Sequence, residues 1–123
     1  MGKGALLAIT DGGNNVVVGL AAGQSITTGD SNVLIGKEAG DGFDTEGQNV
    51  AIGDHALGAA VNGAEACVAI GYGAMFGAAT QGGTVAIGKD ALAALTSGEG
   101  NVAIGYASLD ACTDSDYNTA VGH

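Results

Sequence analysis

Residues 84–105 read TVAIGKDALAALTSGEGNVAIG, and they contain the apolar core Val-Ala-Ile-Gly twice, 17 residues apart. Related cores follow at the same spacing in both directions, with one step of 18 residues where a residue is inserted before Cys67. A spacing that varies by only one residue identifies an internal repeat, which is the typical pattern of a stacked, solenoid-like protein. The cores lie at residues 15–19, 32–36, 49–53, 67–71, 84–88, 101–105 and, as a last partial copy, 118–122.

The register extends to the N-terminus, because stepping back 17 residues from Gly19 and Ile26 reaches Gly2 and Ile9. We therefore expect a single repeat domain over residues 1–123 that begins and ends in mid-repeat. Its expected divisions are a partial coil 1–14, coils 15–31, 32–48, 49–66, 67–83, 84–100 and 101–117, and a partial coil 118–123.

The second and fourth positions of each core are Val or Ile, and side chains two apart on a strand share one face. Branched residues suit such a surface, so we expect these two columns to form the structural core of the coil. The middle residue is small and points to the other face. A strand that is apolar on both faces is buried on both, which predicts that a second copy of the chain covers one of them. The best-conforming core residues are Val50, Ile52, Val68, Ile70, Val85, Ile87, Val102 and Ile104.

Every core ends in glycine, which indicates a turn with positive φ or a backbone approach too close for a Cβ atom. These turn glycines include Gly19, Gly36, Gly53, Gly71, Gly88 and Gly105. A short apolar patch such as Ala91-Leu92 follows and predicts a second short strand. An apolar anchor column comes after it, at Ile9, Ile26, Phe43, Ala78, Leu95 and Cys112.

The repeat length decides the fold class. A unit of 17 residues is too short for the helix pair of a helical repeat, and a glycine in every core disfavours a helix by about 1 kcal/mol each. The sequence therefore predicts an all-β protein, a parallel β-solenoid of about seven coils. The recurring core asparagines at 15, 32, 49, 101 and 118 predict a stacked amide ladder along it.

Composition excludes several classes of function. The chain has 3 Lys and Arg residues against 13 Asp and Glu residues, for a net charge of −10. Nucleic-acid binding needs clustered cations, so neither nucleic acid nor an anionic membrane is an expected partner. No apolar run reaches the roughly 18 residues of a membrane span, so membrane insertion is not expected.

Few residues offer chemistry. His55 stands beside Asp54 without a third partner in the sequence, which favours an exposed surface pair over a catalytic one. Asp114 and Asp116 are a weak calcium candidate, because the acids do not recur in one column. Cys67 and Cys112 lie in different columns, which predicts two small apolar thiols. We expect no catalytic residue, no cofactor and no enzyme activity.

The motif Asn-Val-Ala-Ile-Gly-x-x-Ala-Leu resembles repeats of bacteriophage tail fibres and the head repeats of trimeric autotransporter adhesins. Residues 84–100 and 101–117 carry the resemblance best. It implies a left-handed parallel β-roll, a homotrimer, and a place outside the cell, on a virion or cell surface.

Two functions remain open on these observations. One is a non-catalytic fibre or adhesin segment that mediates attachment, with itself as partner and a cell-surface receptor or glycan as a possible second partner. The other is a subunit of an extracellular filament formed by end-to-end stacking of solenoids, because exposed strand edges are templates for pairing.

Overall fold

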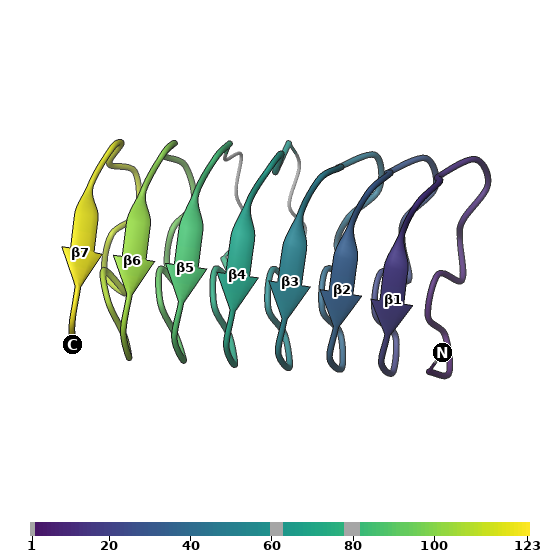
Figure 1. Cartoon of the computed structure of the whole chain (residues 1–123), viewed down its shortest axis with the longest axis horizontal. Coiled ribbons are helices and arrows are strands. Elements are labelled where there is room, and N and C mark those ends of the chain that lie inside the picture. Colours follow the sequence, from purple (N-terminus) through teal and green to yellow (C-terminus); the bar gives the residue numbers. More distant parts are fainter. Residues whose placement is uncertain (1, 60–62, 78–81) are drawn as a thin grey trace.

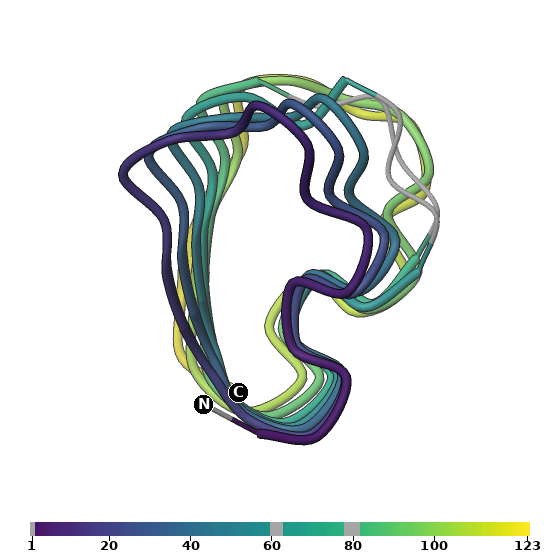
Figure 2. The ribbon, with the colours of Figure 1, turned by 90° about the vertical axis from the view of Figure 1, so that its right-hand side faces the viewer.

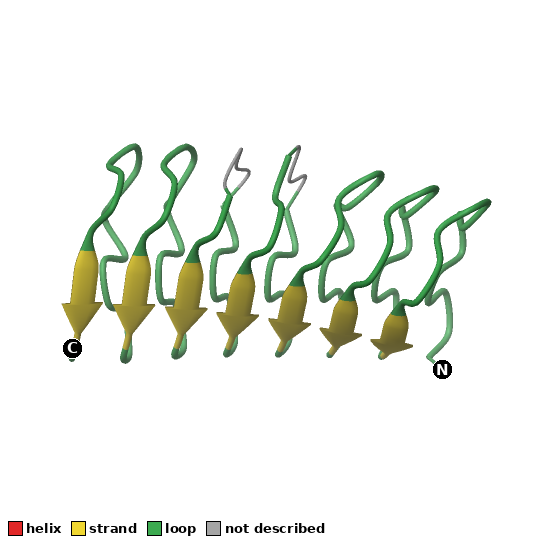
Figure 3. Cartoon of the chain, turned by 45° about the horizontal axis from the view of Figure 1, so that its top comes forward, coloured by secondary structure: helices red, strands yellow, loops and turns green. Residues whose placement is uncertain are grey.

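The computed structural model describes residues 2–59, 63–77 and 82–123, which form a β-solenoid of about six turns without any helix in these ranges. One parallel sheet of seven short strands runs along it in chain order (Figure 1; Figure 3). The strands are β1 (Val16–Val18), β2 (Val33–Ile35), β3 (Val50–Ile52), β4 (Val68–Ile70), β5 (Val85–Ile87), β6 (Val102–Ile104) and β7 (Thr119–Val121). The predicted all-β parallel solenoid is confirmed.

Each coil is joined to the next by backbone hydrogen bonds in strict register. Val33 pairs with Val50 and Val50 with Val68, so the inserted residue is absorbed outside the strands. The N–H of Gly88 donates to the carbonyl of Ile70 at 2.8 Å, and the same bond recurs along the sheet. The turns are bonded in this way too, since the N–H of Met75 donates to the carbonyl of Ala91 at 2.9 Å. The coils therefore follow one another with a similar outline when viewed along the axis, each shifted slightly from the one before (Figure 2).

The middle residue of each strand, not the Val and Ile columns, points into the coil. Leu34, Ala51 and Ala86 are fully buried, whereas their strand neighbours are half-buried or exposed. The predicted structural core is therefore wrong for a single chain, because its members lie on the outer face of the sheet. These outward residues are Val50, Ile52, Val68, Ile70, Val85, Ile87, Val102 and Ile104.

Side-chain volume explains why the small residue faces inward. Where the strand carries Leu34, the facing turns carry Gly23 and Gly40, and a Cβ on either would lie within 2.9 Å of a Leu34 methyl group. Where the strand carries alanine, the turn six residues later supplies the bulk. The pairs of strand and turn residues are Val17 and Gly23, Leu34 and Gly40, Ala51 and Leu57, Ala69 and Met75, Ala86 and Leu92, and Ala103 and Leu109. The interior is too narrow for two large side chains at one level.

The turn glycine is required on both of the expected grounds. Gly71 has a φ of 136°, and a Cβ on it would lie 2.5 Å from the carbonyl oxygen of Gly88 in the next coil. Only glycine adopts this conformation without strain, and only glycine permits this approach. The column therefore sets how closely successive coils can stack.

The apolar patch after this glycine is a turn rather than the predicted second strand. Its second residue is left-handed, with φ of 49° at Leu57, 51° at Met75 and 51° at Leu92. The side chains are buried nonetheless, because the bend points them at the strand. Of the predicted anchor column, Ile26, Phe43 and Leu95 are fully buried and Ile9 and Cys112 are partly buried. The remaining member, Ala78, lies outside the described residues.

The predicted asparagine ladder forms, mainly through bonds to the backbone. The Oδ1 of Asn32 accepts from the N–H of Asn49 at 3.0 Å, and the Nδ2 of Asn32 donates to the carbonyl of Glu46 at 2.8 Å. Each amide thus satisfies the backbone of its own coil and of the next. Thr84 breaks the pattern, since its buried Oγ1 has no hydrogen-bond partner.

Replacement of the turn glycine tests the stacking distance. We expect Gly71→Ala to lower the free energy of unfolding by about 3 kcal/mol or more, because the new Cβ meets a backbone oxygen in a glycine-only conformation. Thermal and urea unfolding followed by circular dichroism would measure it. Gly13→Ala is the matched control, because a Cβ there has nothing within 4 Å; equal effects of the two variants would contradict the account.

A double-mutant cycle tests the volume exchange between strand and turn. Leu92→Gly should lower the free energy of unfolding by about 2–4 kcal/mol through cavity formation, and Ala86→Leu by about 1–3 kcal/mol through overpacking. The double variant recreates the arrangement of Leu34 and Gly40, so its loss should be smaller than the sum by roughly 2 kcal/mol. Additive losses in urea unfolding would show that the two positions do not share one space.

Candidate functional site

The outer face of the sheet is an uncharged apolar strip. It consists of the first and third residues of β1 to β7, all of them Val or Ile except Thr119. The strip is half-buried in the middle strands and open at its ends, where Val16 is 52% and Val121 75% exposed. Contiguous exposed apolar surface is typical of sites where proteins contact a partner, so the strip is a candidate interaction surface.

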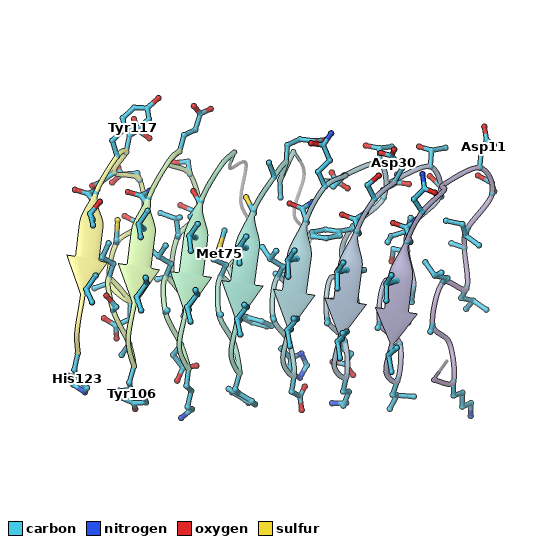
Figure 4. All side chains as sticks on the ribbon, in the orientation of Figure 1. Asp11, Asp30, Met75, Tyr106, Tyr117 and His123 are labelled. Carbon is cyan, nitrogen blue, oxygen red and sulfur yellow. The ribbon has the colours of Figure 1, made fainter. Side chains whose placement is uncertain are left out.

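A second surface follows the turn glycines. In the column directly after them, Tyr72 and Tyr106 face outward at 53% and 51% exposure. Lys89 lies between these two tyrosines, with its Nζ 5.8 Å from the ring centroid of Tyr72 and 5.5 Å from that of Tyr106. The ring of His123 stacks on Tyr106 at 5.1 Å (Figure 4). The C-terminal half of this column is therefore a ladder of three rings and one lysine.

His55 has more partners than the sequence indicates. Its Nδ1 lies 3.1 Å from Glu38 and its Nε2 3.4 Å from Asp54. Glu38 is the residue that the 17-residue step places directly beside His55 in the previous coil. The expected pair of Asp54 and His55 is thus a triad, and reading the repeat by columns would have found the missing carboxylate.

A pocket of about 230 Å³ opens next to this histidine. Among the described residues, its lining is His55, Tyr72, Gly73, Phe76, Asp90 and Ala93. These residues come from three successive coils, and none of them belongs to a strand. Of these residues, only His55 is a candidate predicted from the sequence, because Phe76 and Asp90 occur once in their columns and have no repeat signal.

The other candidate carboxylates and thiols lie outside the pocket, where they bond to the backbone, are exposed or are buried. Asp116 accepts a hydrogen bond from the N–H of Glu99 at 2.9 Å, and Asp114 is exposed. Within the part of the chain that the structure describes, no cluster of three or more His, Cys, Asp or Glu residues could hold a metal ion. Burial raises the pKa of the Cys67 thiol. Burial, and then the nearby charge of Glu38, raises the pKa of Asp41.

The described residues contain no helix that could cross a membrane. No family model matches the chain, and neither the curated proteins nor the solved structures contain a match to it.

Proposed function

We propose that this chain is a segment of a non-catalytic structural fibre or surface adhesin that mediates attachment, and that it works as a homotrimer outside the cell. The observation that carries the proposal is the uncharged Val and Ile strip on the outer face of the sheet. A strip that spans seven strands has no covering element within the described chain. A second and third copy supply that cover.

The shape of the strip supports assembly with identical copies. Its residues repeat in each coil at about 4.8 Å, so a second straight, equally spaced strip matches it along its whole length. Neither column of the strip contains a charged residue. Obligate interfaces between identical subunits are similarly apolar.

The trimer and the handedness come from the resemblance to tail-fibre and adhesin-head repeats. The winding is consistent with it, because the chain seen from its N-terminal end runs counterclockwise as it recedes (Figure 2). That course corresponds to the left-handed β-roll that the resemblance implies. Three such rolls about a common axis would place the three strips against one another and direct the turns outward.

End-to-end stacking into a filament is the second candidate. The observation that favours it is that β1 and β7 are the edge strands of the sheet. Strand edges with free backbone groups can pair with another chain. In this arrangement the outer strip plays no part in the main contact, so the two candidates use different surfaces.

A charge on the strip separates the two candidates. We expect the unmodified protein to sediment as three copies of the 11.7 kDa chain, about 35 kDa, and Ile70→Asp to shift it to monomer. An unpaired carboxylate in the apolar contact opposes association by several kcal/mol. Analytical ultracentrifugation measures the mass, and circular dichroism checks that the outward-facing substitution leaves the coil folded.

Ser97→Asp is the matched control, because it adds the same charge at an exposed residue that is not part of the strip. It should remain trimeric. A monomer or dimer in the unmodified protein would contradict the trimer. Filaments that lengthen with concentration and persist in Ile70→Asp would favour end-to-end stacking.

A further inference from the structure

The pocket beside His55 exists because one side chain is missing from a column. The column two residues after the turn glycine carries Glu38, His55, Gly73 and Asp90 in successive coils. At Gly73 there is no side chain between His55 of the previous coil and Asp90 of the next coil. The Asp90 carboxylate leans into this space, since a Cβ on Gly73 would lie 2.8 Å from its Oδ1. The gap is therefore open to solvent and has a carboxylate at one end.

Aromatic rings form the other walls of the pocket. The His55 ring meets Phe76 edge-on at 5.7 Å and 90°, and meets Tyr72 at 6.4 Å and 80°. Phe76 is 45% exposed, and it stands between the small residues Gly58 and Ala93 of its own column. These edge-to-face contacts fix the orientations of the three rings relative to one another, and all three residues line the pocket.

The charges around the pocket favour a cation. Its lining includes Asp90, and the flanking His55 is held between Glu38 and Asp54. The nearby lysines are already paired with neighbouring carboxylates, Lys37 with Glu38 at 3.2 Å and Lys89 with Asp90 at 3.4 Å. The whole chain carries a net charge of −10. Three carboxylates, of Glu38, Asp54 and Asp90, therefore face the two lysines, and the surplus of one negative charge favours an organic cation over an anion.

One ring of the pocket, that of Tyr72, already lies near an ammonium group, that of Lys89. The Lys89 Nζ lies over Tyr72 at 5.8 Å from the ring centroid, a distance at which the ring quadrupole attracts a cation. The pocket itself is mainly apolar and, at about 230 Å³, smaller than the roughly 300–1,000 Å³ of sites for drug-sized ligands. Both features suit a small cation with an apolar shell better than a strongly hydrated primary amine.

We propose that the pocket of His55, Tyr72, Phe76 and Asp90 binds a trimethylammonium group such as that of choline. The rings contact the methyl groups, and Asp90 compensates the charge. This inference deepens the proposed attachment function by naming the chemistry of the partner. It does not depend on the trimer, because no lining residue lies on the strip.

Titration calorimetry with choline chloride tests the proposal, with 3,3-dimethylbutanol as a neutral ligand of the same shape. We expect choline to bind at least about tenfold more tightly than the neutral analogue, and its methyl protons to shift upfield under the rings in NMR spectra. Asp90→Asn and Phe76→Ala should each weaken choline binding about tenfold. Asp110→Asn removes the same charge at an exposed site three coils from His55, one coil beyond Asp90, and should change nothing.

Other outcomes would overturn the assignment. These are no binding up to about 50 mM choline, equal binding of the neutral analogue, or a stronger response to methyl galactoside, which would indicate a sugar site. Sedimentation with phosphatidylcholine vesicles distinguishes a lipid headgroup from choline carried on a polymer. A monomeric chain that binds choline would refute the trimer alone, and a trimer that does not bind choline would refute the pocket alone.

Discussion

The in-register hydrogen bonds between successive coils are the interaction on which the rest of the structure depends. They join strand to strand and also turn to turn, so a side chain at one position always lies beside its equivalent in the next coil. The glycine column permits the close approach, and the asparagine column satisfies a backbone N–H just before β2, β3, β4 and β7. Because of this register, like residues form columns along the axis, and such columns make up the apolar strip and the ladder of rings.

Much of this architecture is predictable from the sequence because each coil repeats the same physical requirement. Gly71 and its equivalents, the buried Asn32 and Asn49, and the anchors Ile26 and Leu95 all occupy the positions that the repeat indicates. Which face of the strand points into the coil could not be predicted in this way, because alternation alone does not distinguish inside from outside when both faces are apolar. The exchange of volume between Leu34 and Gly40 carries that information, and it becomes visible only when strand and turn are compared across coils.

The candidate sites were less predictable, because they depend on departures from the repeat. Gly73 and Phe76 depart from their columns, and Asp90 gains its role from the gap that Gly73 leaves. The strip and the pocket lie on different surfaces of the coil, one on the strands and one on the turns. Assembly through the first thus leaves the second accessible to a partner.

Distances along the axis test the stacked coil most directly. Spin labels on cysteines introduced at Gly13, Asp30 and Asp116, in a background without Cys67 and Cys112, would lie in one column of the repeat. Figure 4 shows one of these positions, Asp30, at the loop end of its coil. The account predicts about 24 Å between 30 and 116 and about 29 Å between 13 and 116, because each coil adds about 4.8 Å. Double electron–electron resonance on chains diluted with unlabelled protein measures both. If the two distances did not differ by about the spacing of one coil, the result would contradict the stacked arrangement.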